Sequence, residues 1–110
     1  MKRILLVIAS LCLLCVSDLY AQKTVTLRVM SMNIRQGGEY AGNKSEPYSE
    51  LINKYQPDVV ALQEVDYKTT RNGKRDWLNE VAMQTGMFPY FCKSITYQGG
   101  GFGTALLSKY

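Results

Sequence analysis

The sequence predicts an α/β fold whose strands and helices follow the order β-α-β-α-β-β. Three observations lead to this prediction. Two apolar segments rich in β-branched residues, 24–34 and 59–64, each run into polar residues at their ends. One segment between them and another after them carry apolar residues at helical spacing. A third run, aromatic and β-branched, covers residues 90–97 and continues through a glycine-rich segment into a last short strand.

The first 21 residues have the features of an export signal. Basic "MKR" precedes the apolar run "ILLVIASLCLLCV", which is shorter than the roughly 20 residues that a membrane-spanning helix needs. The small residue Ala21 places the mature start at Gln22. We therefore expect residues 1–21 to be a signal peptide, and residues 22–110 to be a partial domain of a secreted or periplasmic protein. Lipid modification at Cys15 is a weaker alternative, because Leu14 is bulky where such sites carry small residues.

Composition narrows the classes of function. The chain has 13 Lys or Arg and 9 Asp or Glu, a net charge of +4, with no basic cluster. This balance suits an anionic substrate, but a solvated surface explains it equally well. The sequence has no histidine, and Cys12 and Cys15 lie in the predicted signal peptide, so residues 22–110 hold one cysteine and no CxxC pair. This argues against a zinc site of the usual kind in the mature part. Cys92 is expected to be a small buried hydrophobe, or the partner of a cysteine outside this chain.

The first half predicts a strand–helix–strand unit. Segment 24–34 alternates between apolar and polar residues at its start, and both of its faces turn apolar further on, as in a strand entering a covered sheet. Ser45 is a candidate cap for the next helix, Pro47 suits its first turn, and Pro57 ends it. The predicted inner face of this helix consists of Tyr48, Leu51, Ile52 and Tyr55. The second strand covers residues 59–64, so we expect a right-handed βαβ unit with parallel strands.

The second half predicts a helix followed by a β-hairpin. A polar loop with an Asn-Gly turn leads to a helix that Asp76 caps and Gly86 ends. The inner face of that helix consists of Leu78, Val81, Ala82 and Thr85. The segment "QGGGFG", residues 98–103, lacks the spacing of a phosphate-binding loop and joins strand 90–97 to a last strand, 104–108. It therefore predicts a hairpin turn and not a phosphate cradle.

Two polar residues stand at the ends of the two parallel strands. Asn33 lies near the end of the first, and Glu64 closes the second. Because the carboxyl ends of parallel strands meet at one edge of a sheet, we expect these side chains to lie together. One amide and one carboxylate suit a hard cation such as Mg²⁺, with Mn²⁺ as an alternative, acting on phosphate. From spacing alone, Asn33 can equally be a turn residue and Glu64 a polar end of a strand.

Three segments resemble successive blocks of the endonuclease/exonuclease/phosphatase family, which has the DNase I-like fold. They are "VMSMNIRQGG", "PDVVALQEVD" and "GFGTALLSKY", and they occur in the family's order. The resemblance covers the N-terminal portion of the family's domain. It implies the N-terminal part of a DNase I-like α/β sandwich, with mixed β-sheets flanked by helices. It also implies that Asn33 and Glu64 hold the catalytic divalent metal, and that Glu64 is a catalytic residue.

The same resemblance implies an exported, Mg²⁺-dependent phosphoesterase that hydrolyses a phosphodiester with a metal-activated water. Substrates across the family include nucleic acids, inositol phosphates and lipid head groups. The family's Asp-x-Asn pair and its late Asp-His pair do not occur in this chain. We therefore expect an N-terminal fragment that is inactive alone, without a stable membrane span. The alternative is a non-catalytic exported binding module that reuses the first half of the fold.

Other polar and aromatic residues have two interpretations each. Arg71 follows the Glu64 strand and either reaches a substrate phosphate or lies in solvent. The same holds for Arg35. Asp66 either supports the metal ligands from behind or caps the loop. Tyr97 could be taken for the family's catalytic tyrosine, but its place before the glycine-rich turn favours a strand-end aromatic. Trp77 is expected to be a core or surface aromatic.

Overall fold

The structure, a computed structural model, describes residues 24–110, so the predicted signal peptide 1–21 and Cys15 lie outside the described residues. The elements are β1 (Val29–Asn33), α2 (Arg35–Gly38), η2 (Glu39–Ala41), α3 (Glu46–Tyr55), β2 (Val59–Tyr67), η3 (Thr70–Asn72), α4 (Trp77–Thr85), β3 (Phe88–Tyr97) and β4 (Gly100–Ser108). The predicted order of strands and main helices is confirmed, with short helical turns added after β1 and β2. Within residues 24–110, no helix has the length and apolar character to cross a membrane.

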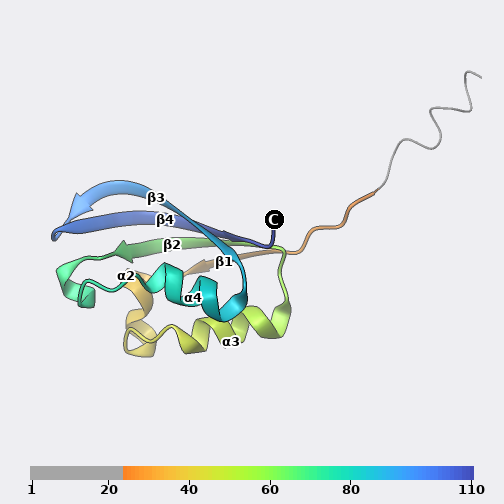
Figure 1. Ribbon diagram of the computed structural model, residues 1–110, viewed down its shortest axis with the longest axis horizontal. Coiled ribbons are helices and arrows are strands. Elements are labelled where there is room, and N and C mark those ends of the chain that lie inside the picture. Colours follow the sequence, from red (N-terminus) through yellow and green to blue (C-terminus); the bar gives the residue numbers. More distant parts are fainter. Residues whose placement is uncertain (1–23) are drawn as a thin grey trace, which may run out of the picture.

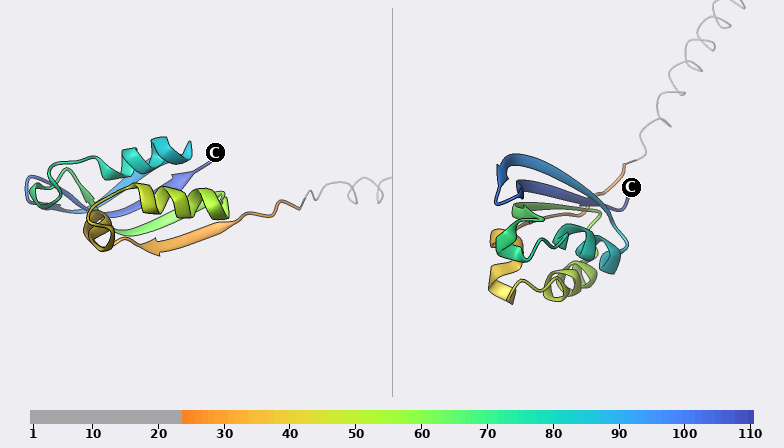
Figure 2. Two further views of the ribbon diagram at one scale, coloured as in Figure 1. Left: turned by 90° about the horizontal axis from the view of Figure 1, so that it is seen from below. Right: turned by 60° about the vertical axis from the view of Figure 1, so that its left-hand side comes forward.

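The four strands form one mixed sheet in the order β1-β2-β4-β3. β1 pairs with β2 in parallel, with Val29 opposite Val59, which confirms the parallel strand–helix–strand prediction. β4 is antiparallel to both of its neighbours, β2 and β3. Helices α3 and α4 pack side by side on the same face of this sheet (Figure 1; Figure 2). The described fold is therefore a two-layer arrangement of one sheet and one helical layer.

The hydrophobic core lies between the sheet and the two helices. Its buried residues are Ile34, Ile52, Val60, Leu62, Val65, Trp77, Leu78, Val81, Ala82, Met87, Ala105 and Leu107. Trp77 is its largest buried side chain, and Tyr48 meets the indole edge-on with ring centroids 5.1 Å apart. Each such aromatic or aliphatic side chain contributes about 1.5–3 kcal/mol when it leaves water. Trp77 is thus a core aromatic, one of the two roles that the sequence allowed.

Helix α4 forms as predicted. The Asp76 carboxylate accepts the backbone N–H of Asn79 at 3.3 Å, which satisfies one of the free N–H groups of the first turn. Gly86 ends the helix in the left-handed conformation, with φ +68°. Of the predicted inner face, Leu78, Val81 and Ala82 are buried and Thr85 is half-buried.

The inner face of α3 differs from the prediction. Ile52 is buried and Tyr48 is half-buried, but Leu51 and Tyr55 are 39% and 54% exposed. Ser45 and Ser49 are buried instead. Ser45 stands at the start of the helix but makes no capping bond, because its hydroxyl donates to Glu80 of α4 at 3.1 Å. Ser45, just before the helix, therefore contacts α4, while the Ser49 hydroxyl donates to the Glu46 carbonyl within α3. The apolar spacing could not show either contact.

The bounds of all four strands differ from the prediction, and β3 begins at Phe88, two residues before the predicted start at residue 90. The first strand is confined to β1. Pairing with β2 begins with Val29 opposite Val59, so residues 24–28 extend beyond the start of β2 and have no strand beside them. β2 does not end at Glu64 but continues to Tyr67, since β4 extends far enough to pair with it. β4 begins at Gly100. The turn consists of Gln98 and Gly99, both with positive φ (46° and 76°), which confirms the hairpin interpretation of the glycine-rich segment.

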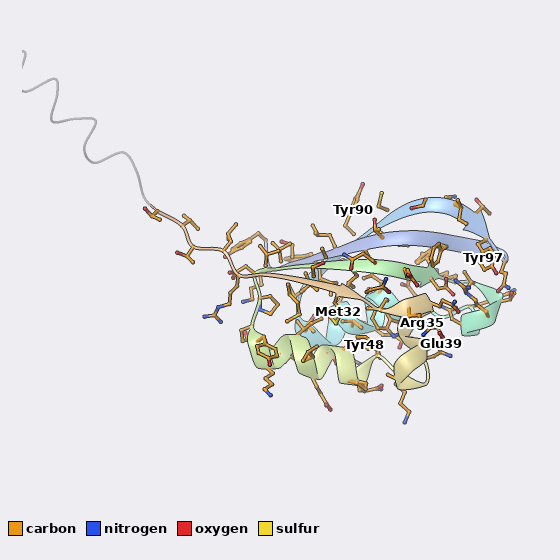
Figure 3. The ribbon with its side chains drawn as sticks, turned by 180° about the vertical axis from the view of Figure 1, so that it is seen from behind. Met32, Arg35, Glu39, Tyr48, Tyr90 and Tyr97 are labelled. Atoms are coloured by element: carbon orange, nitrogen blue, oxygen red, sulfur yellow. The ribbon has the colours of Figure 1, made fainter. Side chains whose placement is uncertain are left out.

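The sheet face opposite the helices is exposed in the described part of the chain. Val29 of β1 and Tyr90 of β3 are 69% and 70% exposed, and Tyr90 projects away from the helical layer (Figure 3). Cys92 lies on the same strand as Tyr90, two residues further on, and is an exposed free thiol. The expectation that Cys92 is a small buried hydrophobe is therefore wrong, because its neighbour Phe91, and not Cys92, points into the core.

Candidate functional site

A bulge in β2 places the predicted carboxylate. Leu62 pairs with Ala105 and Val65 pairs with Gly103, so Gln63 and Glu64 together face the single residue Thr104. Glu64 adopts a positive φ of 57°, which a residue with a side chain rarely does. Bulges of this kind change the direction of a side chain within a strand, and they are common beside active sites. The bulge thus gives the Glu64 carboxylate a direction that regular strand geometry at this position would not give it.

Glu64 and Asn33 are in direct contact. The amide Nδ2 of Asn33 donates to Oε1 of Glu64 at 2.8 Å. Oδ1 of Asn33 accepts the backbone N–H of Arg35 at 2.9 Å. Because a backbone N–H can only donate, this second bond fixes which end of the amide faces Glu64. Within residues 24–110, Oε2 of Glu64 takes part in no hydrogen bond, so one carboxylate oxygen is held in place and the other is available to a ligand.

The donor set at this position fits an ion that prefers oxygen and retains water. No group of three or more His, Cys, Asp or Glu within residues 24–110 is placed to hold a metal. Mg²⁺ is commonly held by one or two carboxylates, with the remaining ligands supplied by water and substrate phosphate. One carboxylate and one amide oxygen match this preferred coordination of Mg²⁺. They do not match the closed tetrahedral nitrogen and sulfur sites of structural zinc.

A pocket of about 210 Å³ opens beside Glu64. It is lined by residues from the turn after β1, from β2, from the loop after β2 and from the β3–β4 hairpin, namely Gln36, Glu64, Arg71, Ile95, Tyr97 and Phe102. Tyr97 at the hairpin tip and Arg35 just after β1 lie at the same end of the molecule (Figure 3). The pocket therefore lies at the carboxyl end of β1, where the sequence predicts the site.

Arg71 forms part of the pocket wall and is firmly held. Its Nε and Nη2 donate to the two carboxylate oxygens of Asp66 at 2.6 and 2.7 Å. Asp66 is fully buried and also accepts the hydroxyl of Thr69 at 2.8 Å. The guanidinium lies 4.7 Å from the ring centroid of Tyr97 and 5.4 Å from that of Phe102. The hydrogen bonds to Asp66 raise the pKa of Arg71 above its ordinary value, so Arg71 is a fixed cation.

The remaining candidates have structural surroundings of their own. Arg35 forms an exposed ion pair with Glu39 at 3.0 Å and is not among the residues that line the pocket. Asp66 anchors Arg71 and so does more than cap a loop. Tyr97 is a strand-end aromatic, as expected, but it also stacks near Arg71. Neither amide atom of the buried Asn72 has a hydrogen-bond partner within the described residues.

Sequence reasoning missed the hairpin's contribution to the pocket. Ile95 and Phe102 face each other across β3 and β4, after a second bulge that leaves Ser94 without a partner. Nothing in the spacing of "YFCKSITY" indicates an extra residue there. The place of Gln36 in the pocket wall was not predicted either. Gln36 lies in a sharp turn after β1 and has a positive φ of 59°. The adjacent Gly-Gly pair is the one sequence signal of that turn.

Comparisons with known proteins agree on the fold. A family model described as "Endonuclease/Exonuclease/phosphatase family" matches residues 30–110. A functionally unknown conserved protein from Enterococcus faecalis V583 is similar in structure, with a TM-score of 0.56 and 19% identity over 76% of this chain and 31% of that one. An endonuclease/exonuclease/phosphatase protein from Beutenbergia cavernae DSM 12333 gives a TM-score of 0.54 and 20% identity over 74% of this chain and 25% of that one. No curated protein matches the sequence. The chain thus spans less than a third of either solved structure, and both likenesses concern the fold alone.

Proposed function

This chain belongs to the endonuclease/exonuclease/phosphatase family, and from that premise we propose that the complete protein is a Mg²⁺-dependent phosphoesterase, with Mn²⁺ as an alternative ion. We also propose that it is secreted or periplasmic, exported by a signal peptide at residues 1–21. The family consists of hydrolases that act on phosphate esters. The observation that carries the proposal is the bond between Asn33 and Glu64 in the β2 bulge, because it joins the two residues that the family resemblance implies as metal ligands.

The proposed roles follow from the geometry of the two side chains. Glu64 supplies the charged oxygen through Oε2, and Asn33 holds the carboxylate through Oε1. The Oδ1 of Asn33, which already accepts the Arg35 N–H, would supply a neutral metal ligand through its second lone pair. When bound, a divalent ion would neutralise charge on the phosphate oxygens and activate a water for attack on phosphorus. The proposed reaction is hydrolysis of a phosphodiester. Nucleic acid, inositol phosphate and lipid head groups are the candidate substrates.

Residues 22–110 alone are expected to be inactive. The sequence contains no histidine, and the carboxylate of Asp66, which contacts the pocket residue Arg71, is held in an ion pair with it. Of the described residues that line the pocket, Glu64 is the one carboxylate, and the proposal assigns it to the metal. General acid–base catalysis contributes typically about 10²–10⁴-fold to rate, so a piece with only the metal and pocket residues lacks a large part of the rate enhancement.

The test uses the complete gene product. Glu64→Ala is expected to reduce metal-dependent hydrolysis of bis-p-nitrophenyl phosphate to background, while the circular dichroism spectrum stays unchanged. Glu50→Ala is the control, because Glu50 is an exposed carboxylate on α3 that forms none of the ion pairs found within residues 24–110. Unchanged turnover in Glu64→Ala would refute its catalytic role. A wild-type protein that folds but hydrolyses nothing with any divalent ion would favour the binding-module alternative.

A further inference from the structure

We propose that Arg71 binds the phosphate of the substrate through its Nη1 group, and that Asp66 is the positioning residue that holds it there. The proposal rests on the phosphoesterase function and assigns a substrate-binding residue to it. Arg71 and Glu64 line the same pocket, so an anion placed beside Glu64 lies in the space that Arg71 faces.

The bond pattern of the guanidinium supports this role. Asp66 takes Nε and Nη2, and within the described residues Nη1 takes part in no hydrogen bond. The three nitrogens of a guanidinium are coplanar and rigid, so a carboxylate on one edge directs the remaining N–H groups to a defined place. Arg71 therefore offers a donor group whose direction is set before any ligand binds, and this lowers the entropic cost of binding.

The surroundings of Arg71 restrict it further. The Tyr97 and Phe102 rings lie within 5.4 Å of the guanidinium carbon, and Ile95 completes the apolar part of the pocket wall. Apolar walls exclude water and strengthen a charge-assisted hydrogen bond. They also suit the organic part of an ester more than a second phosphate. Because the described wall holds one guanidinium, already paired with Asp66, the pocket favours a singly charged phosphodiester over an inositol polyphosphate.

The competing explanation is that the ion pair only fastens the loop after β2 to the sheet. Asp66 is fully buried, and removing one member of a buried ion pair leaves an uncompensated charge. Arg71→Ala alone could therefore unfold the loop. The informative variant is Asp66→Asn with Arg71→Gln, which removes both charges and keeps hydrogen-bonding groups of similar shape. Arg71→Lys is the second variant, since it keeps the charge but loses the planar fork.

The chain offers a matched control in Arg75 and Glu80. Arg75 donates through Nε at 3.0 Å and through Nη2 to the two carboxylate oxygens of Glu80, so this is the same kind of fork. Neither residue lines the pocket beside Glu64. The control variant Arg75→Gln with Glu80→Gln thus removes a second two-bond ion pair, more exposed than the first, at a place outside the pocket. It reports what loss of such a pair does to stability alone.

Three quantities are measured on the complete gene product: the Kd of dimethyl phosphate by NMR titration, the KM and kcat for bis-p-nitrophenyl phosphate, and the Kd of Mn²⁺ by electron paramagnetic resonance. The paired Asp66/Arg71 variant is expected to weaken dimethyl phosphate binding and raise KM about 10-fold, the effect of losing one charge-assisted hydrogen bond. Its Mn²⁺ affinity is expected to stay unchanged. Arg71→Lys should fall between it and wild type, and the Arg75/Glu80 control should match wild type.

Equal dimethyl phosphate affinity and equal KM in wild type and the paired variant would overturn the proposal and leave the ion pair as a fastening of the loop. The Mn²⁺ measurement keeps this failure separate from failure of the proposed function. If wild type binds no Mn²⁺ and hydrolyses nothing, the phosphoesterase function fails, while the dimethyl phosphate titration still decides whether Arg71 binds a phosphodiester anion. If wild type binds no dimethyl phosphate, the role of Arg71 is refuted.

Discussion

The side-chain amide of Asn33 donates a hydrogen bond to Oε1 of Glu64 at 2.8 Å, although 31 residues separate them in sequence. Two features of the backbone produce this contact. Parallel pairing of β1 with β2 brings Asn33 opposite Gln63, and the bulge then turns Glu64. The contact holds one oxygen of the carboxylate, so it sets the direction of the other.

Asn33→Ala is expected to weaken divalent-cation binding about 10- to 100-fold, the usual effect of losing a partner that orients a metal ligand. Ser31→Ala is the matched control. Ser31 lies two residues earlier on β1 and accepts a bond from the Gln63 side chain at 3.1 Å, so Ser31→Ala loses a cross-strand contact to the neighbour of Glu64 and leaves the bond to Glu64 itself in place. Mn²⁺ titration of the complete gene product measures both. An Asn33→Ala protein with wild-type affinity would remove Asn33 from the site.

Stability is expected to fall in acid partly through Glu80. Hydrogen bonds from Arg75 and Ser45 lower the pKa of Glu80 below its ordinary value of 4.5. A carboxyl group whose pKa is lower in the folded state stabilises the protein above the unfolded pKa, and that contribution disappears as pH falls through the folded pKa. The pair is partly exposed, so the contribution is at most about 1 kcal/mol.

Urea unfolding of the complete gene product between about pH 6 and about pH 3 measures this contribution. Glu80→Gln should lower stability near neutral pH and flatten the acid-side loss. Glu50→Gln, on the exposed side of α3, should leave the curve parallel to that of wild type. If Glu80→Gln and wild type lose stability equally on acidification, the ion pair with Arg75 does not contribute to the pH dependence.

We expect Gly103 of β4 to be glycine because the neighbouring strand leaves no room for a side chain, and not because its backbone binds a phosphate. A Cβ at Gly103 would lie 2.1 Å from the carbonyl oxygen of Cys92, and backbone atoms cannot rotate away. We expect Gly103→Ala to cost about 3 kcal/mol, the upper end for overpacking. Gly99→Ala is the comparison. Gly99 has φ +76° and open space around it, so it should cost about 1 kcal/mol through backbone strain alone. Urea midpoints rank the two, and equal losses would contradict the steric explanation.

The sequence was sufficient for the order of elements and for α4. Asp76, the apolar residues of α4 and Gly86 act locally, so spacing along the chain shows what they do. The prediction that Asn33 and Glu64 lie together is also confirmed, because parallel strands have their carboxyl ends at one edge of the sheet. These predictions needed only local signals and one rule of sheet topology.

The remaining differences come from contacts between distant segments. Ser45 at the start of α3 is buried and donates to Glu80, 35 residues further along the chain. The length of β2 depends on how far β4 extends beside it, and the β2 bulge depends on the register between them. Cys92 is exposed because of the side of the sheet on which its strand places it. Apolar periodicity within one segment carries no information about any of these.

Calorimetric titration of Mg²⁺ or Mn²⁺ into the complete gene product, compared between wild type and Glu64→Gln, is the decisive test of the metal site at Asn33 and Glu64. Glu64→Gln keeps the size of the side chain and its ability to accept the Asn33 hydrogen bond, and it removes only the charge. We expect single-site uptake by wild type, loss of uptake in Glu64→Gln, and full uptake in Glu50→Gln. Equal uptake by wild type and Glu64→Gln, or no uptake by a folded wild type, would contradict this expectation.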